Sequence, residues 1–437
     1  MDTKTQDRII QLLNKEVVPA TGCTEPVAVA LAVAYAASVL PTNAVEPDRI
    51  EVLLSANMLK NAMGVGIPGT GMIGLPIAIA LGYVVADPTK ELKVLDAVPE
   101  ELMNRAKDMV NHTGLINIQL KPGDVDKLYI EVNISAGGHN STAIIEKQHT
   151  NISTLLFDNK VVSTKKSNKG ECAGNDTAVE EDITLNFDLV YEFAMTTPIE
   201  KLEFIKEAAV LNKNASNASL KGEYGHAVGR MIQSPLGQKY LGNSHLTRML
   251  TYTGAACDAR MDGAPVAVMS NSGSGNQGIT ATLPVLTFAE DEKKSHEETI
   301  RALILSNLMV VYIKQKLGRL SALCGCVVAA TGSSCGITYL MGGTKEQIGF
   351  AIKNMVGNIT GMLCDGAKPS CAMKVTSGVS SAMLSALLAM EQKVVTSSEG
   401  IVDNDVDLTV DNLTSIGREA MCETDQLVLK IMTSKNK

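Results

Sequence analysis

Apolar residues with helical spacing, or in long runs without charge, dominate both ends of the chain. A first helix is predicted over about 6–14, and a second begins at Thr24-Glu25-Pro26. Thr24 suits the cap, Glu25 the positive helix end and Pro26 the first turn. The following VAVALAVAYAASVL is apolar on every face, which is typical of a buried helix. Similar patterns predict helices over about 75–84, over 298–317 and from Pro369 onwards.

The period of the pattern changes near Leu115, where apolar and polar residues begin to alternate. Alternation interrupted by Gly, Asn and Asp predicts a meander of antiparallel strands over 116–120, 128–134, 142–145 and 153–157. Residues 49–54 are a further candidate strand. The polar segment KKSNKGECAGND, 165–176, is the best candidate for a linker.

These elements together predict an α+β fold. A predominantly helical body is formed by both ends of the chain, and a small antiparallel β-meander is inserted into it. We expect residues 1–110 to be the N-terminal helical part, 111–170 the β insert, and 171–437 the main helical body with most of the cysteines.

Composition narrows the functional classes. The 437 residues carry a net charge of −8 without basic runs, which argues against a nucleic-acid partner. Long uncharged stretches exist, but Gly, Pro, Ser and Asn interrupt them and no Trp flanks them, so we expect no membrane span. The N-terminus lacks a secretory pattern, and nine cysteines make an odd number without regular spacing. We therefore expect a cytoplasmic protein whose cysteines bind a metal or act in catalysis.

Two segments match G-x-G-x-x-G, namely GVGIPG at 64–69 and GSGNQG at 273–278. Neither stands between a strand and a helix of a βαβ unit, so a dinucleotide site is not indicated. Each is either a tight turn or a nest of backbone N–H groups for a small anion such as a carboxylate. The second segment is also rich in side chains that are costly to bury without a partner, which indicates a polar pocket: Asn271, Ser272, Ser274, Asn276 and Gln277.

Several cysteines lie in unusual local sequences. Cys324, Cys326 and Cys335 occur in SALCGCVVAATGSSCG, Cys364 and Cys371 in CDGAKPSC, and Cys23 in ATGCTEP. A loop that turns back before Pro369 would aim Cys364 and Cys371 at one point. Cys371 and Cys23 would then stand at helix N-termini, which stabilise a thiolate. From the residues alone, buried free cysteines and an iron–sulfur site both remain open, because no ferredoxin spacing is present.

The chain resembles the L-cysteine desulfidase family, relatives of the iron–sulfur L-serine dehydratase α chain. The segments that carry the resemblance are PATGCTEP, NMLKNAMGVGIPGTGMIGLPIA, CDARMDGAPVAVMSNSGSGNQGITATLPV, RLSALC and GMLCDGAKPSCAMKV. The resemblance implies an oxygen-sensitive [4Fe-4S] cluster with one open iron, held by Cys324, Cys364 and Cys371. It also implies that Cys23 is the proton acceptor. Cys326, two residues beyond Cys324, is an alternative ligand.

The reaction implied by the resemblance is β-elimination from L-cysteine, giving sulfide, ammonia and pyruvate. The substrate carboxylate would be held by the polar segment Asn271, Ser272, Gly273, Ser274, Gly275 and Asn276, with Lys60, Asn61 and Arg260 as further polar candidates. The small amino-acid substrate is the expected partner, and a homodimer is plausible. The alternatives are L-serine dehydration by the same chemistry, a pyridoxal phosphate enzyme with Lys374 as its Schiff base, and a non-catalytic iron–sulfur or thiol redox sensor.

Overall fold

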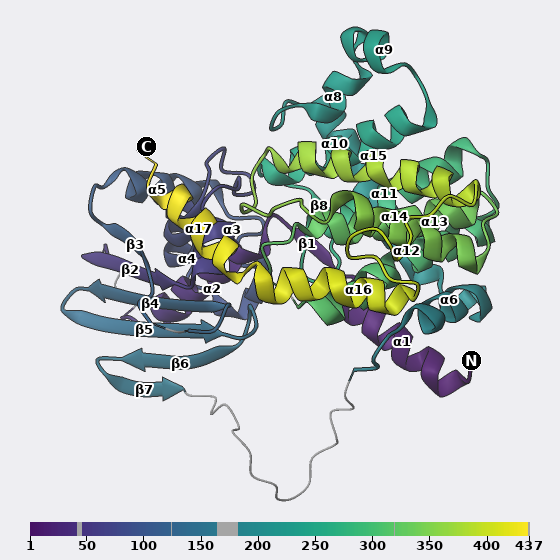
Figure 1. Ribbon diagram of the computed structural model, residues 1–437. Helices are drawn as coiled ribbons and strands as arrows, with labels where there is room; N and C mark the ends of the chain where they lie inside the picture. The colour runs from purple at the N-terminus through teal and green to yellow at the C-terminus, as the bar shows by residue number, and fades with distance from the viewer. Residues whose placement is uncertain (42–45, 124, 164–181, 319, 436–437) are drawn as a thin grey trace, which may run out of the picture. The chain divides into compact units, whose positions relative to one another are not determined.

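The computed structural model describes residues 1–41, 46–123, 125–163, 182–318 and 320–435. The chain forms two compact units. The helical unit comprises Met1–Ala20, Asp182–Cys364 and Lys368–Asp425, and the sheet unit comprises Thr21–Glu181, Asp365–Ala367 and Gln426–Lys437. Figure 1 labels the elements of both.

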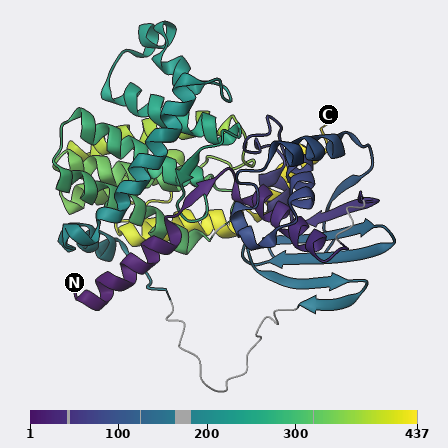
Figure 2. The same ribbon diagram turned by 180° about the vertical axis from the view of Figure 1, so that it is seen from behind.

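The helical unit is a bundle whose long helices pack side by side (Figures 1 and 2). Its long helices are α1 (Thr3–Glu16), α6 (Phe187–Thr196), α7 (Lys206–Lys221), α10 (His245–Met261), α11 (Gly275–Asp291), α12 (His296–Leu317), α13 (Gly325–Leu340), α14 (Lys345–Ile359), α15 (Cys371–Met390) and α16 (Val406–Ser415). Two short helices, α8 (Val228–Gln233) and α9 (Pro235–Leu241), project beyond the bundle. The short strand β8 (Ala267–Met269) pairs with β1 (Pro19–Thr21), and α17 (Cys422–Thr433) closes the chain.

Helix α13 is the core of this bundle, because it packs against α11, α12, α14 and α15. Its residues are almost all buried and almost all small or apolar. Gly332 and Gly336 make this packing possible. A side chain at Gly332 would collide with the Ser306 carbonyl of α12, and one at Gly336 would collide with Val285 of α11. A helix surrounded on several sides needs such small residues wherever a neighbouring backbone approaches closely.

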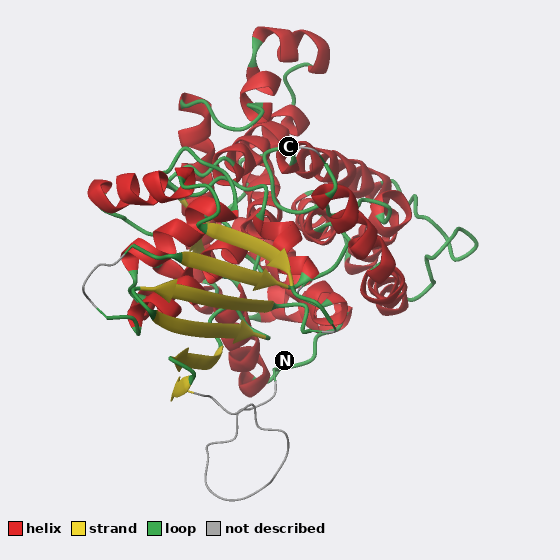
Figure 3. Ribbon diagram, turned by 90° about the vertical axis from the view of Figure 1, so that its left-hand side faces the viewer, coloured by secondary structure: helices red, strands yellow, loops and turns green. Residues whose placement is uncertain are grey.

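The sheet unit contains a six-stranded sheet (Figure 3) with the order β3-β2-β4-β5-β6-β7. Its strands are β2 (Arg49–Leu54), β3 (Ile116–Leu120), β4 (Tyr129–Ala136), β5 (His139–Glu146), β6 (Ile152–Phe157) and β7 (Lys160–Ser163). Alternate residues of β4 are buried under α2 (Thr24–Ser38), which packs on β4, β5 and β6. The unit also contains α3 (Ala56–Ala62), α4 (Leu75–Val85) and α5 (Glu100–Asn111).

The predicted α+β class is confirmed, with helices at both ends of the chain and a small sheet between them. The predicted meander is incomplete, however, because β2 pairs parallel with β3 and antiparallel with β4, and β7 adds an edge strand. The sheet therefore recruits residues from the N-terminal part. As a result, the two units group the chain differently from the expected parts 1–110, 111–170 and 171–437. The linker predicted at 165–176 lies outside the described residues.

Among the described residues, α15 alone is long and apolar enough, by length and composition, to cross a membrane. That is weak evidence for a span, because helices inside folded bundles pass the same test. This helix packs against α10, α13 and α14. Leu384 and Leu387, on its outer side, are about half exposed. The predicted absence of a membrane partner and the expected homodimer stay predictions.

Candidate active site

Backbone pairing in the helical unit brings two of the predicted ligand cysteines together. Leu323 and Leu363 form an antiparallel bridge. The N–H of Cys324 donates to the carbonyl of Met362 at 3.0 Å, and the N–H of Cys364 donates to that of Ala322 at 2.7 Å. Residues that flank a bridged pair point to the same side of the ladder. The side chains of Cys324 and Cys364 therefore share one face.

The third predicted ligand, Cys371, is the first residue of α15 and follows a turn in which its N–H donates to the Lys368 carbonyl at 2.9 Å. The ammonium of Lys374 donates to the carbonyl of Leu363 at 2.8 Å and so ties the Cys364 segment to α15. Burial raises the pKa of the Cys324 thiol, and the neighbouring thiols of Cys364 and Cys371 raise it further. The three thiols therefore lie in one neighbourhood.

The structure gives Cys324 and Cys326 different contacts, although both thiols lie near Cys371. Cys324 stands at the N-cap of α13, and the N–H of Cys326 opposes the rise in its pKa. The Cys326 thiol instead donates to the Lys374 carbonyl at 3.1 Å, on the side of α13 that packs against Gly378 of α15. Cys326 is thus engaged in helix packing, and this geometry favours Cys324 as the ligand.

Among the described residues, no three His, Cys, Asp or Glu side chains converge on a point that would hold a single metal ion. A cluster places its thiolates on several iron atoms, so its ligands need not converge on one point. Two of the three thiols stand at N-termini of long helices, where the helix dipole favours an anion. The donor set in this neighbourhood therefore fits an iron–sulfur cluster, and the ligand assignment stays a prediction.

The polar segment before α11 is a tight turn in which Ser272 has φ +49° and Gly273 has φ +80°. Asn271 is fully buried, and its amide donates to the backbone carbonyl and to Oδ1 of Asn307, both at 3.0 Å. Ser272 Oγ donates to Asn271 Oδ1 at 2.9 Å. The Asn271 side chain is therefore committed to holding the turn.

Backbone hydrogen bonds also reduce the number of N–H groups that the predicted nest can offer to an anion. The N–H of Ser272 donates to the Glu16 carbonyl at 2.9 Å, and the N–H of Ser274 donates to that of Asn271 at 3.0 Å. Gly275 and Asn276 remain as the first residues of α11, with Ser274 as its cap. The first N–H groups of a helix have no intrahelical acceptor. The part of the segment suited to a carboxylate is therefore the N-terminus of α11.

Two buried side chains meet this helix end. Arg260, at the end of α10, donates from Nη1 to Asn276 Oδ1 at 3.1 Å, and its guanidinium lies against Gly275. Gln277 donates from Nε2 to the Asn271 carbonyl at 2.9 Å, and its amide lies against Gly325, the residue after Cys324. This links the predicted substrate-binding segment to the thiol neighbourhood within one unit.

The sheet unit contains the predicted proton acceptor. Cys23 is buried and is the N-cap of α2, and its thiol donates to Glu25 Oε2 at 3.1 Å. The other oxygen of Glu25 accepts from Asn61 Nδ2 at 3.2 Å. The sequence pattern predicted for Glu25 only a position at the positive end of the helix, and no contact with Cys23. The signal for this contact was the spacing of two residues between the thiol and the carboxylate in CTE.

Lys60 precedes Asn61 on α3 and is 1% exposed. The backbone of Gly366, which has φ +87°, lies against the Lys60 carbonyl, and a side chain there would collide with it. Gly22, with φ +72°, lies in the same way against Pro68. These close approaches fix the backbone on either side of Cys23 and Asn61.

The first glycine-rich segment is a closed turn. Gly66 and Ile73 form a bridge, the N–H of Ile67 donates to the Met72 carbonyl at 3.0 Å, and the N–H of Gly74 donates to that of Val65 at 2.9 Å. The turn satisfies its own backbone groups. Of the two interpretations of this segment, the structure supports the tight turn.

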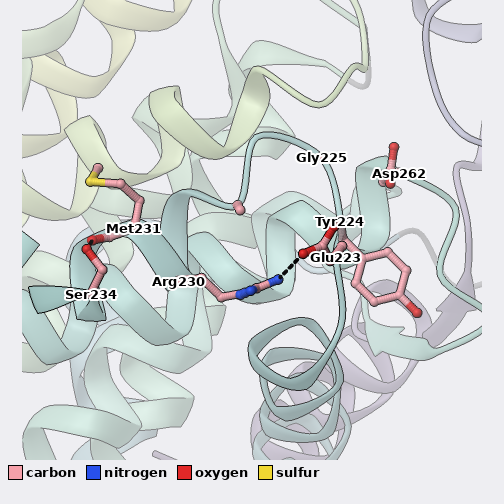
Figure 4. A pocket seen from close by; sticks show the side chains of 8 residues that line it. Glu223, Tyr224, Gly225, Arg230, Met231, Ser234 and Asp262 are labelled. Carbon is pink, nitrogen blue, oxygen red and sulfur yellow. Dashed lines mark hydrogen bonds and ion pairs between the residues drawn. The ribbon is translucent and has the colours of Figure 1, made fainter. Parts of the chain in front are cut away.

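A pocket of about 500 Å³ in the helical unit was not predicted from the sequence (Figure 4). Glu223 and Arg230 both line it and form an ion pair, with 3.5 Å between Oε1 and Nη1. The neighbouring Asp258 is fully buried and accepts the N–H of Gly229 at 3.1 Å. Burial raises the pKa of the Asp258 carboxyl to about 6. Gly225 lines the pocket and lies close to both Asp258 and Pro369.

The family model described as serine dehydratase alpha chain matches residues 89–430. A UPF0597 protein of Porphyromonas gingivalis is 70% identical over the full length of both chains. Another from Parabacteroides distasonis is 59% identical, again over the full length of both. A third, from Actinobacillus pleuropneumoniae, is 41% identical and covers 100% of this chain and 99% of its own. The chain therefore belongs to a family related to the iron–sulfur serine dehydratase alpha chain.

Proposed function

We propose that this chain is an iron–sulfur-dependent lyase that eliminates the β-substituent of L-cysteine and yields sulfide, ammonia and pyruvate. The observation that carries the proposal is the neighbourhood of Cys324, Cys364 and Cys371, with two of the thiols at helix N-termini. Membership of the serine dehydratase family supports the same class of chemistry.

In this proposal, Cys324, Cys364 and Cys371 hold a [4Fe-4S] cluster. When bound, such a cluster with one open iron supplies a Lewis acid for the β-substituent of the substrate. The helix N-termini at Cys324 and Cys371 favour the thiolate forms that ligation requires. Lys374 keeps the Cys364 segment in place through its bond to the Leu363 carbonyl.

Cys23 is assigned the role of proton acceptor. A thiol must lose its own proton before it can accept one, and Glu25 Oε2, at 3.1 Å from the sulfur, is positioned to take that proton. Asn61 orients the carboxylate by donating to its other oxygen. The Cys23 thiolate then removes the α-proton, while the β-substituent leaves with the electron pair of its bond to carbon. The resulting aminoacrylate tautomerises and hydrolyses to pyruvate and ammonia.

Of the predicted segment Asn271–Asn276, its last two residues would bind the substrate, with the N–H groups of Gly275 and Asn276 facing the carboxylate. Lys60, buried beside Asn61, stays a candidate for substrate binding in the sheet unit. L-Serine is the second candidate substrate, because the matching family model is a serine dehydratase chain. Serine and cysteine differ in the leaving group and use the same proton transfer.

The test is anaerobic reconstitution with iron and sulfide, followed by measurement of sulfide and pyruvate released from L-cysteine, with L-serine assayed in parallel. Cluster-dependent sulfide with an equal amount of pyruvate supports the desulfidase. Pyruvate from serine alone moves the assignment to the dehydratase. Equal activity without iron contradicts the iron–sulfur mechanism, and a loaded cluster without turnover of either amino acid supports the sensor.

The pyridoxal phosphate alternative depended on Lys374 as a Schiff-base lysine. The Lys374 ammonium donates to the Leu363 carbonyl, next to Cys364, which gives this lysine a role in the thiol neighbourhood. Activity that requires added pyridoxal phosphate and tolerates iron chelation would restore that alternative.

A further inference from the structure

Two side chains at the N-terminus of α11 each bury a polar atom without a hydrogen-bond partner. Arg260 is 3% exposed and Gln277 is 2% exposed. Within the described part of the chain, neither Arg260 Nε nor Gln277 Oε1 has a hydrogen-bond partner. Buried polar atoms are nearly always partnered, and one left idle costs free energy. Arg260 comes from the end of α10 and Gln277 from the first turn of α11, where the helix end already offers N–H groups to an anion.

The two atoms are opposite in kind. Arg260 Nε is a charged donor and needs an acceptor, whereas Gln277 Oε1 needs a donor. The amide orientation of Gln277 is set by its Nε2, which donates to the Asn271 carbonyl at 2.9 Å. A single ligand that satisfies both atoms must carry both an anionic acceptor and a donor. An α-amino acid carries both, in its carboxylate and its ammonium group.

We propose that Arg260 and Gln277 form a zwitterion clamp at the N-terminus of α11. The guanidinium of Arg260 and the first N–H groups of α11 bind the α-carboxylate, and Gln277 Oε1 accepts a hydrogen bond from the α-ammonium. This inference rests on the proposed function for its substrate class and adds the residues that select an α-amino acid. Neither residue is assigned a part in the proton transfer.

The local packing places this clamp beside the thiols. Gln277 lies against Gly325, which follows Cys324 directly, and a side chain at position 325 would collide with the Gln277 amide. Gly275 likewise leaves the space that the Arg260 guanidinium occupies. An amino acid held by its α-groups here would present its β-substituent in the neighbourhood of Cys324.

Two other residues provide matched controls. Gln347 occupies the same third position of α14 that Gln277 occupies in α11, but its Nε2 donates to Met390 at 3.1 Å and its Oε1 accepts from Thr344 at 2.9 Å. Arg301 donates from Nη1 to the Ala194 carbonyl and from Nε to Glu297, both at 2.8 Å. Both controls are fully engaged within the fold.

The experiment measures binding to the iron-free protein by calorimetry, with three probes. L-Alanine has both α-groups and no leaving group, propionate lacks the ammonium, and ethylamine lacks the carboxylate. The wild type should bind L-alanine about tenfold or more tightly than either fragment. Gln277→Met should remove the preference over propionate. Arg260→Lys should weaken the preference over ethylamine, because the guanidinium is lost while the N–H groups of α11 remain. Gln347→Met and Arg301→Lys should keep both preferences, and a melting curve of each variant checks its folding.

Equal binding of the three probes, no binding of any probe, or preferences that survive both clamp variants would overturn the clamp. If ordered water, and not an amino acid, satisfies Arg260 Nε and Gln277 Oε1, one of these outcomes is expected. If the preferences follow the prediction but the reconstituted protein releases pyruvate from neither cysteine nor serine, the proposed function fails and the clamp stands. If the reconstituted protein releases pyruvate but the iron-free protein does not prefer L-alanine, the clamp fails and the proposed function stands.

Discussion

Cys23 in the sheet unit and Cys324 in the helical unit occupy the same local position. Each is buried, and each is the N-cap of a long helix that follows it, α2 or α13. Their neighbours differ. The Cys23 thiol faces the carboxylate of Glu25, and the Cys324 thiol has the thiols of Cys364 and Cys371 as neighbours.

The position at a helix end therefore does not by itself decide the chemical role of either thiol. The neighbouring side chains decide it. A helix N-terminus favours a thiolate at either position. A carboxylate beside the thiol can take its proton and make it a base, whereas further thiols beside it create a set of soft ligands for iron. Exchanging or removing these neighbours is the direct way to test the comparison.

Removing a ligand should have the largest effect. Cys324→Ala is expected to prevent cluster assembly and to abolish turnover, because it deletes one of three proposed ligands. Iron content and the visible absorbance after anaerobic reconstitution measure the first effect, and pyruvate release measures the second. Cys326→Ala is the matched control and should keep its iron, because that thiol donates to the Lys374 carbonyl. Iron loss in Cys326→Ala with retention in Cys324→Ala would reverse the assignment.

Removing the base should stop turnover and spare the cluster. Cys23→Ala is expected to lower kcat by about 10²–10⁴-fold, the usual contribution of a positioned acid or base. Its iron content and absorbance should match those of the wild type. Turnover of L-cysteine at the wild-type rate would show that another group accepts the proton.

Neutralising the partner of the base should have a smaller effect. Glu25→Gln keeps the shape of the side chain but removes the carboxylate that accepts the Cys23 proton. We expect kcat to fall about tenfold or more, with unchanged iron content and partial recovery at higher pH, where the thiol ionises unaided. Glu51→Gln, which removes a carboxylate paired with Arg49 on β2, is the control in the same unit. An unchanged kcat in Glu25→Gln would remove Glu25 from the proposal.

Local signals in the sequence predicted much of the fold and part of the candidate site. The cap pattern Thr24-Glu25-Pro26 correctly predicted a helix start, and the alternation after Leu115 predicted strands at β3 to β6. Those signals lie within a few neighbouring residues. The parallel pairing of β2 with β3 joins residues more than 60 positions apart, and no local pattern encodes it.

The same limit applies to the candidate site. The sequence drew attention to Asn271 and to Gln277 alike, because both are polar residues in one glycine-rich segment. In the fold, Asn271 is committed to Asn307, whereas Gln277 has an oxygen without a partner among the residues that the structure describes. Which polar residue is available depends on partners from distant helices, and these appear only after folding.

The last prediction concerns folding stability and leaves activity aside, and it tests Asp258, a buried acid that accepts a backbone N–H. Burial raises the pKa of Asp258 to about 6, from an ordinary 3.8. The folded protein therefore binds this proton more readily than the unfolded chain between those pH values. Its free energy of unfolding should fall as the pH rises from about 4 to 6, by up to ~3 kcal/mol.

Asp258→Asn keeps an oxygen to accept the N–H of Gly229 and removes the titration. The variant should therefore lose this fall, and near pH 7.5 it should be at least as stable as the wild type. Urea unfolding of the iron-free protein across this pH range measures the difference, with Asp262→Asn at the same pocket as the control. If the free energy of unfolding changed with pH in the same way in the wild type and in Asp258→Asn, the pKa of Asp258 would be ordinary. In that case its N–H donors would offset the cost of burying the Asp258 carboxylate.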